Sequence, residues 1–350
     1  MPVDEARFKR LAETPGVPGR EEQVRRLVMA ELAPLVDEVR VDALGNVIGT
    51  KRGRADVRVM IAAHMDEIGF LVRHIDERGF IRLQPLGGGM GALQMNAQRV
   101  LVHTESGASL RGALQLGRVL GPPQPGETPS LPRQDEFFVD LGLPAEAVRA
   151  AVRVGDFVTM DRTFERVGDC YLSKAIDDRV GLLVMLEALR ALRGHQATIY
   201  AVATVQEEVG LRGAAVSGYA LEPTVMIAVD DTPARDYPGN PPESSITRLG
   251  GGAAIKLMDT SLICNPRLVR HLRDIAEREG IPHQLEILPF GGTDAGAVQR
   301  QRGGVAAITL SIPCRYVHTV NEMASVSDVQ ACVDLLARYL EEAHTGDYRL

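Results

Sequence analysis

The sequence predicts an α/β fold with a mostly parallel central sheet, helices on both faces and an inserted β-rich domain. Beyond residue 170, short apolar stretches alternate with amphipathic stretches of helical periodicity, which is typical of a parallel sheet covered by helices. Between residues 68 and 163, short alternating stretches are instead separated by glycine and proline clusters, which favours a small β-rich unit.

We therefore expect two domains. Residues 1–67 and 164–350 form one discontinuous α/β domain, and residues 68–163 form the insert. Two units agree with a chain of 350 residues, because a typical domain has roughly 150. The proline-rich segment 121–129 of the insert is expected to be an exposed loop.

Hydrophobic periodicity predicts the elements of the α/β domain. Residues 19–36 place apolar side chains on one stripe of a helix, and the apolar run 57–64 is typical of a strand buried on both faces. The helix that follows residue 265 is expected to end at Gly280. The later elements are expected in the order helix, strand, strand, helix, strand, helix, at residues 175–194, 198–206, 224–230, 265–280, 305–313 and 327–344.

Composition excludes several classes of protein. The 39 Lys and Arg residues against 46 Asp and Glu residues give a net charge of −7 without a basic block, so neither nucleic acid nor an anionic membrane is an expected partner. No run of 18 apolar residues is present, and the first residues lack the apolar core of a secretory signal. The four scattered cysteines match neither a disulfide framework nor a zinc ribbon, so we expect reduced thiols and a cytoplasmic location.

Histidines and carboxylates lie where the expected strands end. They are His64 and Asp66 at the first strand, Glu207 and Glu208 after the second, Asp230 at the third and His318 after the fourth, with Asp177 before a helix. Ligands of open α/β sheets bind beyond the carboxyl ends of the strands, so we expect these side chains to meet at one rim. Imidazole and carboxylate groups without thiolates suit zinc, cobalt or manganese in an open hydrolytic site.

This set offers more ligands than one catalytic zinc ion uses. A carboxylate shared by two ions, roughly 3.5–4 Å apart, would use the set economically. One remaining Glu would then serve as general base for the metal-bound water.

Each pair of residues also has a simpler explanation. These explanations are a surface pair for His64 and Asp66, a solvated strand end for Glu207 and Glu208, a helix N-cap for Asp177 and Asp178, and a turn for Asp230 and Asp231. The expected convergence of all these side chains favours the metal site, because independent features are not expected to gather at one rim.

The glycine clusters 250–252 and 291–292 lack the strand–glycine loop–helix context of a nucleotide-binding site.

Seven short segments stand out along the chain. They are GVPGREEQVR (16–25), AAHMDEIGF (62–70), KAIDDRVG (174–181), QEEVGLRGA (206–214), AVDDT (228–232), GGTDAGA (291–297) and RYVHTVNE (315–322). Together and in this order they closely resemble the tetrahedral aminopeptidase family, co-catalytic metallopeptidases related to glutamyl aminopeptidase and also labelled cellulase-M-like. The resemblance covers nearly the full chain, and no ligand position departs from the family's pattern.

The resemblance implies two divalent metal ions per subunit, with zinc or cobalt favoured and manganese also suited. The implied ligands are His64, Asp177 and Asp230 for one ion, and Asp177, Glu208 and His318 for the other, with Asp177 bridging. Glu207 would be the general base, and the carboxylate of Asp66 would fix the tautomer and orientation of His64. The peptide bond between Asp177 and Asp178 would be cis.

The resemblance also implies an assembly and an activity. The insert would be a small β-barrel-like module for dimerisation, and six dimers would build a hollow tetrahedral homododecamer. The activity would be that of a dinuclear aminopeptidase that removes N-terminal residues from short peptides, with a metal-bridging water as nucleophile and Glu207 taking its proton.

Several alternatives stay open on these residues. A dipeptidase, a carboxypeptidase or a deacylase would use the same ligands. Glycoside hydrolysis is disfavoured, because Glu207 and Glu208 are adjacent and point to opposite sides of a strand, and the two histidines would have no role. A non-catalytic scaffold has no support beyond the insert. Arg235 or Arg248 would attract acidic substrates, but the lack of a local charge cluster favours a neutral or broad preference.

Overall fold

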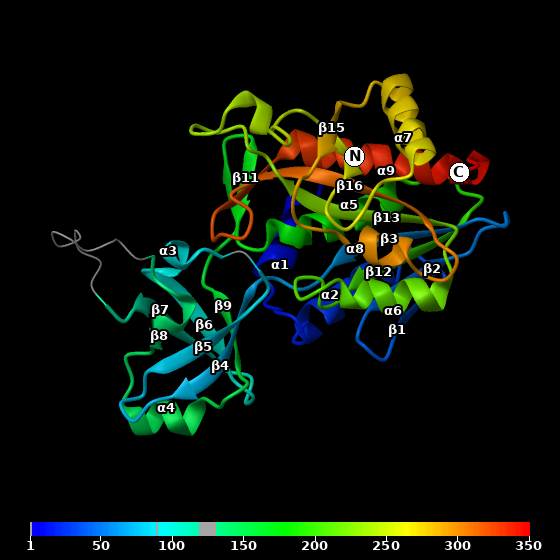
Figure 1. The fold of residues 1–350 in the computed structure, drawn as a ribbon. Helices are drawn as coiled ribbons and strands as arrows, with labels where there is room; N and C mark the ends of the chain where they lie inside the picture. The colour runs from blue at the N-terminus through cyan, green and yellow to red at the C-terminus, as the bar shows by residue number, and fades with distance from the viewer. Residues whose placement is uncertain (1, 89, 119–130) are drawn as a thin grey trace.

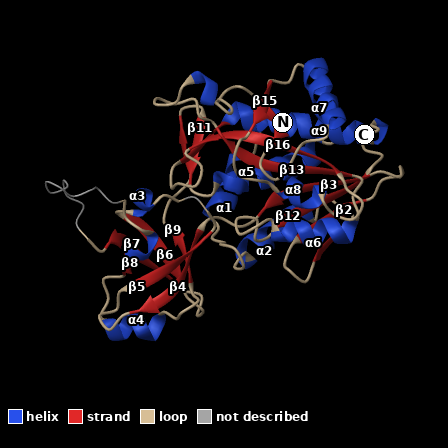
Figure 2. Cartoon of the chain, viewed as in Figure 1, coloured by secondary structure: helices blue, strands red, loops and turns tan. Residues whose placement is uncertain are grey.

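The computed structural model describes residues 2–88, 90–118 and 131–350, and shows a large α/β unit beside a smaller β-barrel (Figure 1). The loop expected at residues 121–129 lies outside the described residues. Figure 2 shows the strands of the two units as separate groups, with helices packed around the larger one.

Four parallel strands form the centre of the large sheet. In spatial order they are β12 (Thr198–Thr204), β3 (Arg58–His64), β13 (Val225–Pro233) and β16 (Ala306–Arg315). They are the four apolar runs from which the sequence predicted a parallel sheet. The register pairs Thr204 of β12 with His64 of β3, so both strands end at the same rim.

Antiparallel strands extend this parallel centre on both sides. Strands β2 (Val47–Lys51) and β1 (Glu38–Val41) continue from β12, and strands β17 (Glu322–Ser325), β11 (Cys170–Ser173) and β10 (Glu165–Val167) continue from β16. Strand β14 (Ala253–Met258) also pairs with β16 and carries β15 (His283–Ile287) at its other edge. The predicted fold class is confirmed, with the antiparallel additions as new detail.

Helices cover the sheet (Figure 1). One group, in which α5 and α9 pack against each other and against the sheet, comprises α1 (Glu5–Glu13), α5 (Ile176–Ala191), α7 (Pro266–Glu279) and α9 (Val326–Glu342). The others are α2 (Glu22–Leu32), α6 (Arg212–Leu221) and α8 (Asp294–Gln299), of which α6 and α8 pack together. Helix α7 ends at Gly280 in the left-handed conformation, with φ of 67°, as predicted.

Helix α5 lies close to the sheet because it carries a glycine where the two meet. A Cβ atom on Gly181 would lie 2.4 Å from the carbonyl oxygen of Val229 and 2.3 Å from the carboxylate of Asp178. Only a residue without a side chain allows this approach, which brings the first turn of α5 to the rim where β3 and β13 end.

The smaller unit is a closed barrel with strand order β4–β5–β8–β7–β6–β9. Its strands are β4 (Gly69–Ile75), β5 (Ile81–Leu86), β6 (Gln98–His103), β7 (Ser109–Leu116), β8 (Phe137–Asp140) and β9 (Phe157–Met160), with helices α3 (Ala92–Met95) and α4 (Ala145–Ala151). Its buried apolar side chains form a cluster separate from the core of the large unit. The division of the chain at residues 68 and 163 into two domains stays a prediction.

Two further expectations concern cysteines and membrane spans. All four cysteines are free thiols, as predicted. Within the described ranges, no helix combines the length and apolar character needed to cross a bilayer.

Candidate metal centre

The rim of the central sheet brings together residues that are up to 254 positions apart in the sequence. His64 ends β3, and Asp230 lies within the last residues of β13. Glu207 and Glu208 lie in the loop between β12 and α6, His318 lies between β16 and β17, and Asp177 is in the first turn of α5. The structure thus brings all six predicted site residues, and Asp66 beside them, to one place.

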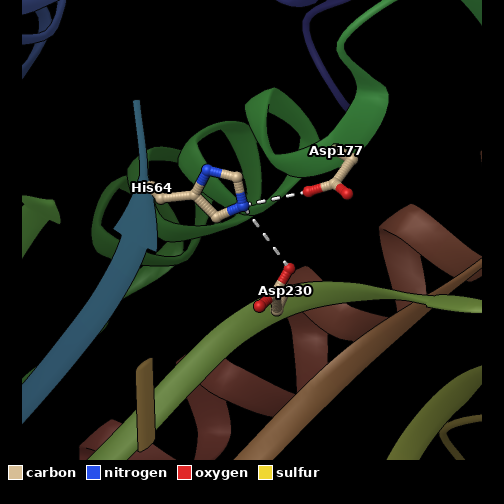
Figure 3. Close-up of side chains that lie close together, drawn as sticks. All are labelled: His64, Asp177 and Asp230. Atoms are coloured by element: carbon tan, nitrogen blue, oxygen red, sulfur yellow. Dashed lines mark hydrogen bonds and ion pairs between the residues drawn. The ribbon is translucent and has the colours of Figure 1, made fainter. Parts of the chain in front are cut away.

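A first group consists of His64, Asp177 and Asp230. Figure 3 shows the imidazole of His64 facing both carboxylates. Its Nε2 atom lies 2.9 Å from Oδ1 of Asp177 and 4.0 Å from Oδ1 of Asp230. All three residues are buried, and one potential ligand atom from each lies within 4.8 Å of the others.

A second group consists of Asp177, Glu208 and His318. The Nε2 atom of His318 lies 3.0 Å from Oδ2 of Asp177 and 3.3 Å from Oε1 of Glu208. Asp177 therefore presents one carboxylate oxygen to each group, which is the position that a bridging ligand occupies in a two-metal site.

The surroundings of His64 orient its ring. Its Nδ1 atom lies 2.9 Å from the backbone carbonyl oxygen of Asp66, so a proton on Nδ1 leaves Nε2 free to face the cavity. The Asp66 carboxylate lies farther away, with Oδ1 3.6 Å from Nδ1. Instead its two oxygens accept hydrogen bonds from the backbone amides of Glu207 and Glu208, each at 3.1 Å.

Two buried carboxylates that were not predicted as site residues also hold the site. Glu322 accepts hydrogen bonds from the backbone amides of Asp177, at 3.1 Å, and His318, at 2.8 Å. Asp178 accepts one from the backbone amide of His64, at 3.1 Å, and the peptide bond between Asp177 and Asp178 is cis, as expected. Asp178 and Glu322 both lie inside segments on which the family resemblance rests, at 174–181 and 315–322, but the resemblance gave neither residue a role in the site.

The carboxylates of the site outnumber the cationic groups near them. Burial and the charge of Asp177 raise the pKa of Asp230 to about 8, although His64 opposes the shift. Burial likewise raises the pKa of Glu207 well above its ordinary value. Burial would also raise the pKa of Asp177, but hydrogen bonds from His318 and His64 outweigh it and lower the pKa. Burial would lower the pKa of His318, yet Glu208 and Asp177 raise it to about 12.

The chemistry of both groups fits divalent metal ions. The donors are imidazole nitrogens and carboxylate oxygens, which zinc, cobalt and manganese accept. Oε1 of Glu208 is buried, and its contact with Nε2 of His318 at 3.3 Å lacks the alignment of a hydrogen bond. Two divalent cations would supply a partner for this oxygen and would neutralise the excess of buried negative charge.

A cavity of about 660 Å³ opens onto both groups. Its polar end is formed by the six site residues, and its other wall is mainly apolar, with Leu211, Pro233, Leu288, Phe290 and Val317. Among the described residues that line it, the only basic side chains are the two histidines of the site. The guanidinium of Arg235 lies outside the lining, 4.6 Å from the ring centroid of Phe290.

Comparisons with known proteins agree with this geometry. A family model described as M42 glutamyl aminopeptidase matches residues 45–335. The chain is 38% identical to the lysyl aminopeptidase of Pyrococcus furiosus over 354 residues, which cover 99% of each chain. Among solved structures, it superimposes on an aminopeptidase of Desulfurococcus kamchatkensis with a TM-score of 0.90 and 40% identity, covering 96% of this chain and 93% of that one. It also superimposes on the Pyrococcus horikoshii TET1 peptidase, described as assembling into a tetrahedron or a large octahedral shell, with a TM-score of 0.84 and 30% identity over 96% and 99% of the chains.

The match to the family model spans most of the chain, and the superpositions on the two solved structures cover 96% of it. M42 peptidases are metal-dependent, which agrees with the donor set at the rim. The chain belongs to the M42 glutamyl aminopeptidase family and is an aminopeptidase.

Proposed function

We propose that this chain is a dinuclear aminopeptidase that removes N-terminal residues from short peptides. His64, Asp177 and Asp230 would hold one divalent ion, and Asp177, Glu208 and His318 would hold the other. The observation that carries the proposal is the sharing of Asp177, whose two oxygens face separate ligand groups at the floor of one cavity. Zinc or cobalt is favoured, and manganese also suits these donors.

Glu207 is the proposed general base. It belongs to neither ligand group, it lines the cavity, and its Oε2 atom lies 3.9 Å from Nε2 of His64. When bound, two divalent ions would lower the pKa of a water between them and polarise the scissile carbonyl. Glu207 would accept the proton of the attacking water at a carboxylate oxygen and return it to the leaving amine.

Asp66 is proposed as a positioning residue for this base. Its carboxylate oxygens accept the backbone amides of both Glu207 and Glu208, and its carbonyl oxygen fixes the His64 ring. Asp66 thus sets the positions of the proposed base, Glu207, and of one proposed ligand from each ion site, His64 and Glu208, relative to one another.

Removal of the metal tests the proposal directly. Release of N-terminal residues from a panel of peptides should stop after dialysis against a chelator and return on addition of zinc, cobalt or manganese. The same peptides with acetylated N-termini should resist cleavage, because a free α-amino group is the substrate feature that defines an aminopeptidase. Metal-replete protein that releases no N-terminal residue, or activity that survives chelation, would contradict the proposal.

The same experiment separates the other candidate activities. A deacylase would act on the blocked substrates, and a dipeptidase would act on dipeptides alone. A glycoside hydrolase needs two flanking carboxyl groups and no metal, so its activity would survive chelation. The contacts of both histidines with the one carboxylate of Asp177 favour metal chemistry over that alternative.

We infer a preference for neutral, apolar N-terminal residues from the cavity wall. Leu288 and Phe290 line it, and neither Arg235 nor Arg248 does. The charge of Arg235 is directed to the ring of Phe290, and Arg248 contacts Gln284 through its backbone. Acidic side chains would therefore meet no cationic partner beyond the site itself.

Phe290 provides the test of this preference. Phe290→Ala should lower kcat/KM for a leucyl substrate about 10-fold, because an apolar contact is lost, and should change an alanyl substrate little. Tyr219→Ala is the matched control, since Tyr219 is also an exposed aromatic residue beside an arginine, Arg302, but lies outside the cavity. Equal losses for both substrates in the Phe290 variant would show that this ring does not contact the substrate side chain.

We also propose that the barrel mediates dimerisation and that the dimers assemble into a tetrahedral homododecamer. The support for a homo-oligomer is the similarity to TET1 of Pyrococcus horikoshii, which is described as able to assemble into a tetrahedron or a large octahedral shell. A cytoplasmic location stays a prediction, supported by the four free thiols.

A further inference from the structure

The loop that carries Glu207 and Glu208 is held by side chains from three other parts of the chain. Strand β12 ends at Thr204, and the next four backbone amides each donate a hydrogen bond to a side-chain oxygen. The pairs are Val205 with Oδ1 of Asn46 at 3.0 Å, Gln206 with Oε1 of Glu21 at 3.1 Å, Glu207 with Oδ1 of Asp66 at 3.1 Å and Glu208 with Oδ2 of Asp66 at 3.1 Å.

The backbone at Gln206 explains why such support matters. Gln206 has a φ of 56°, in the left-handed region that residues with side chains rarely adopt. Such a conformation persists only where surrounding contacts hold it. Since Gln206 directly precedes Glu207, a change of its φ and ψ would redirect the Glu207 and Glu208 side chains away from the cavity.

Asn46 is itself fixed on both sides. It is fully buried in the turn between β1 and β2, and its Nδ2 donates to Oδ2 of Asp42, at 2.7 Å, and to the carbonyl oxygen of Gly213, at 3.1 Å. These bonds orient the amide so that Oδ1 faces the backbone amide of Val205. Asn46 thereby connects the start of the loop that follows β12 to the first turn of α6.

The side chain of Glu21 does not cap the helix at whose N-terminus it lies. It occupies the N-cap position of α2, yet its side chain makes no capping hydrogen bond there. Its Oε1 instead accepts from the amides of Gly19, at 2.8 Å, and Gln206, at 3.1 Å. The side chain is 2% exposed, and burying a carboxylate near Asp66 is unfavourable for folding, so stability alone gives no reason for an acid here.

We propose that Glu21 and Asn46 are positioning residues that, together with Asp66, aim Glu207 and Glu208 into the cavity. The inference rests on the proposed function of that pair. It adds residues from the start of α2 and from the β1–β2 turn to a site otherwise built at the rim of the sheet.

Substitution of Glu21 tests the inference. Glu21→Met keeps the volume and removes the acceptor, so kcat should fall by roughly 10- to 100-fold while KM changes little. Glu21→Gln keeps an oxygen acceptor and should restore most of kcat. Glu22→Met, at the exposed neighbouring position, is the matched control and should behave like the parent protein. Glu21→Asp, which withdraws the oxygen by one methylene group, should give an intermediate loss if Glu21→Met does not fold.

Two further measurements separate positioning from general stability. Hydrogen exchange at the amides of residues 205–208 should be faster in Glu21→Met and in Asn46→Ala than in the Glu22→Met control. In a double variant, Glu21→Met added to Glu207→Gln should lower the residual kcat by a smaller factor than it lowers kcat in the parent protein, because Glu21 acts partly through Glu207.

The results for the Glu21 variants and for the double variant support or overturn the positioning role of Glu21 and Asn46. Unchanged kcat and unchanged exchange in Glu21→Met, or a fully additive loss in the double variant, would overturn it even if the melting temperature falls. If the parent protein releases no N-terminal residues, the proposed function fails instead. Exchange at residues 205–208 then still shows whether Glu21 and Asn46 hold the loop.

Discussion

Glu207→Gln should lower kcat by about 10²- to 10⁴-fold, the usual contribution of a positioned general base. The amide cannot accept a proton from water at neutral pH, whereas its size and its backbone hydrogen bond to Asp66 are preserved. Steady-state kinetics on a leucyl substrate, with metal content measured on the same sample, provides the check. KM and the metal content of the parent protein should be retained, because Glu207 belongs to neither ligand group.

The control for this substitution is Glu243→Gln, at an exposed position outside the cavity lining. It should leave kcat unchanged. Full activity in Glu207→Gln would remove Glu207 from the proposed role, and loss of metal in that variant would assign it to ligation instead.

Lys256→Met should lower the free energy of unfolding by about 3–5 kcal/mol, the range observed when one partner of a buried ion pair is removed. Lys256 is fully buried on β14, with Nζ 2.8 Å from Oε1 of Glu286 and 3.7 Å from Oδ2 of Asp259. Burial opposes its charge, but Glu286 and Asp259 raise its pKa overall, so the ammonium is charged in the folded protein. Without it, two buried carboxylates lose their counter-charge.

A double variant identifies the cause of this loss. Lys256→Met combined with Glu286→Gln removes both charges of the shorter pair, so it should be more stable than Lys256→Met alone. Urea denaturation of metal-replete protein measures the differences, and Lys9→Met, at an exposed lysine, provides the control for loss of a surface charge. Equal stability of the single variant and the parent protein would contradict the expectation.

The order of elements and the candidate residues were accessible from sequence because they depend on local patterns. Strands β3, β12, β13 and β16 read as apolar runs, since parallel strands are buried on both faces. The ends of such strands meet at one rim, so His64, Asp230 and the Glu207–Glu208 pair were expected there. Their grouping into ligand sets depended on the resemblance, and their catalytic roles stay predictions.

Only the tertiary structure decided which carboxylate holds which backbone group. Asp66 was expected to orient His64 through its side chain, but the ring nitrogen lies closer to its carbonyl oxygen, and the carboxylate holds the Glu207–Glu208 amides. Glu21, Asn46 and Glu322 have no local pattern that reveals their partners. Glu21 binds the amide of Gln206, 185 positions away in the sequence. Asn46 binds the amide of Val205, 159 positions away, and Glu322 binds the amide of Asp177, 145 positions away.

By itself, the sequence determined where apolar strands and helices begin and end and which side chains suit metal chemistry, because periodicity and residue type are local properties. The closure of the barrel, the antiparallel edges of the sheet and the direction of the loop that carries Glu207 and Glu208 depend on pairings between distant segments. Hydrogen bonds between such segments form only once packing has set the direction of each side chain, so their geometry is a property of the folded molecule.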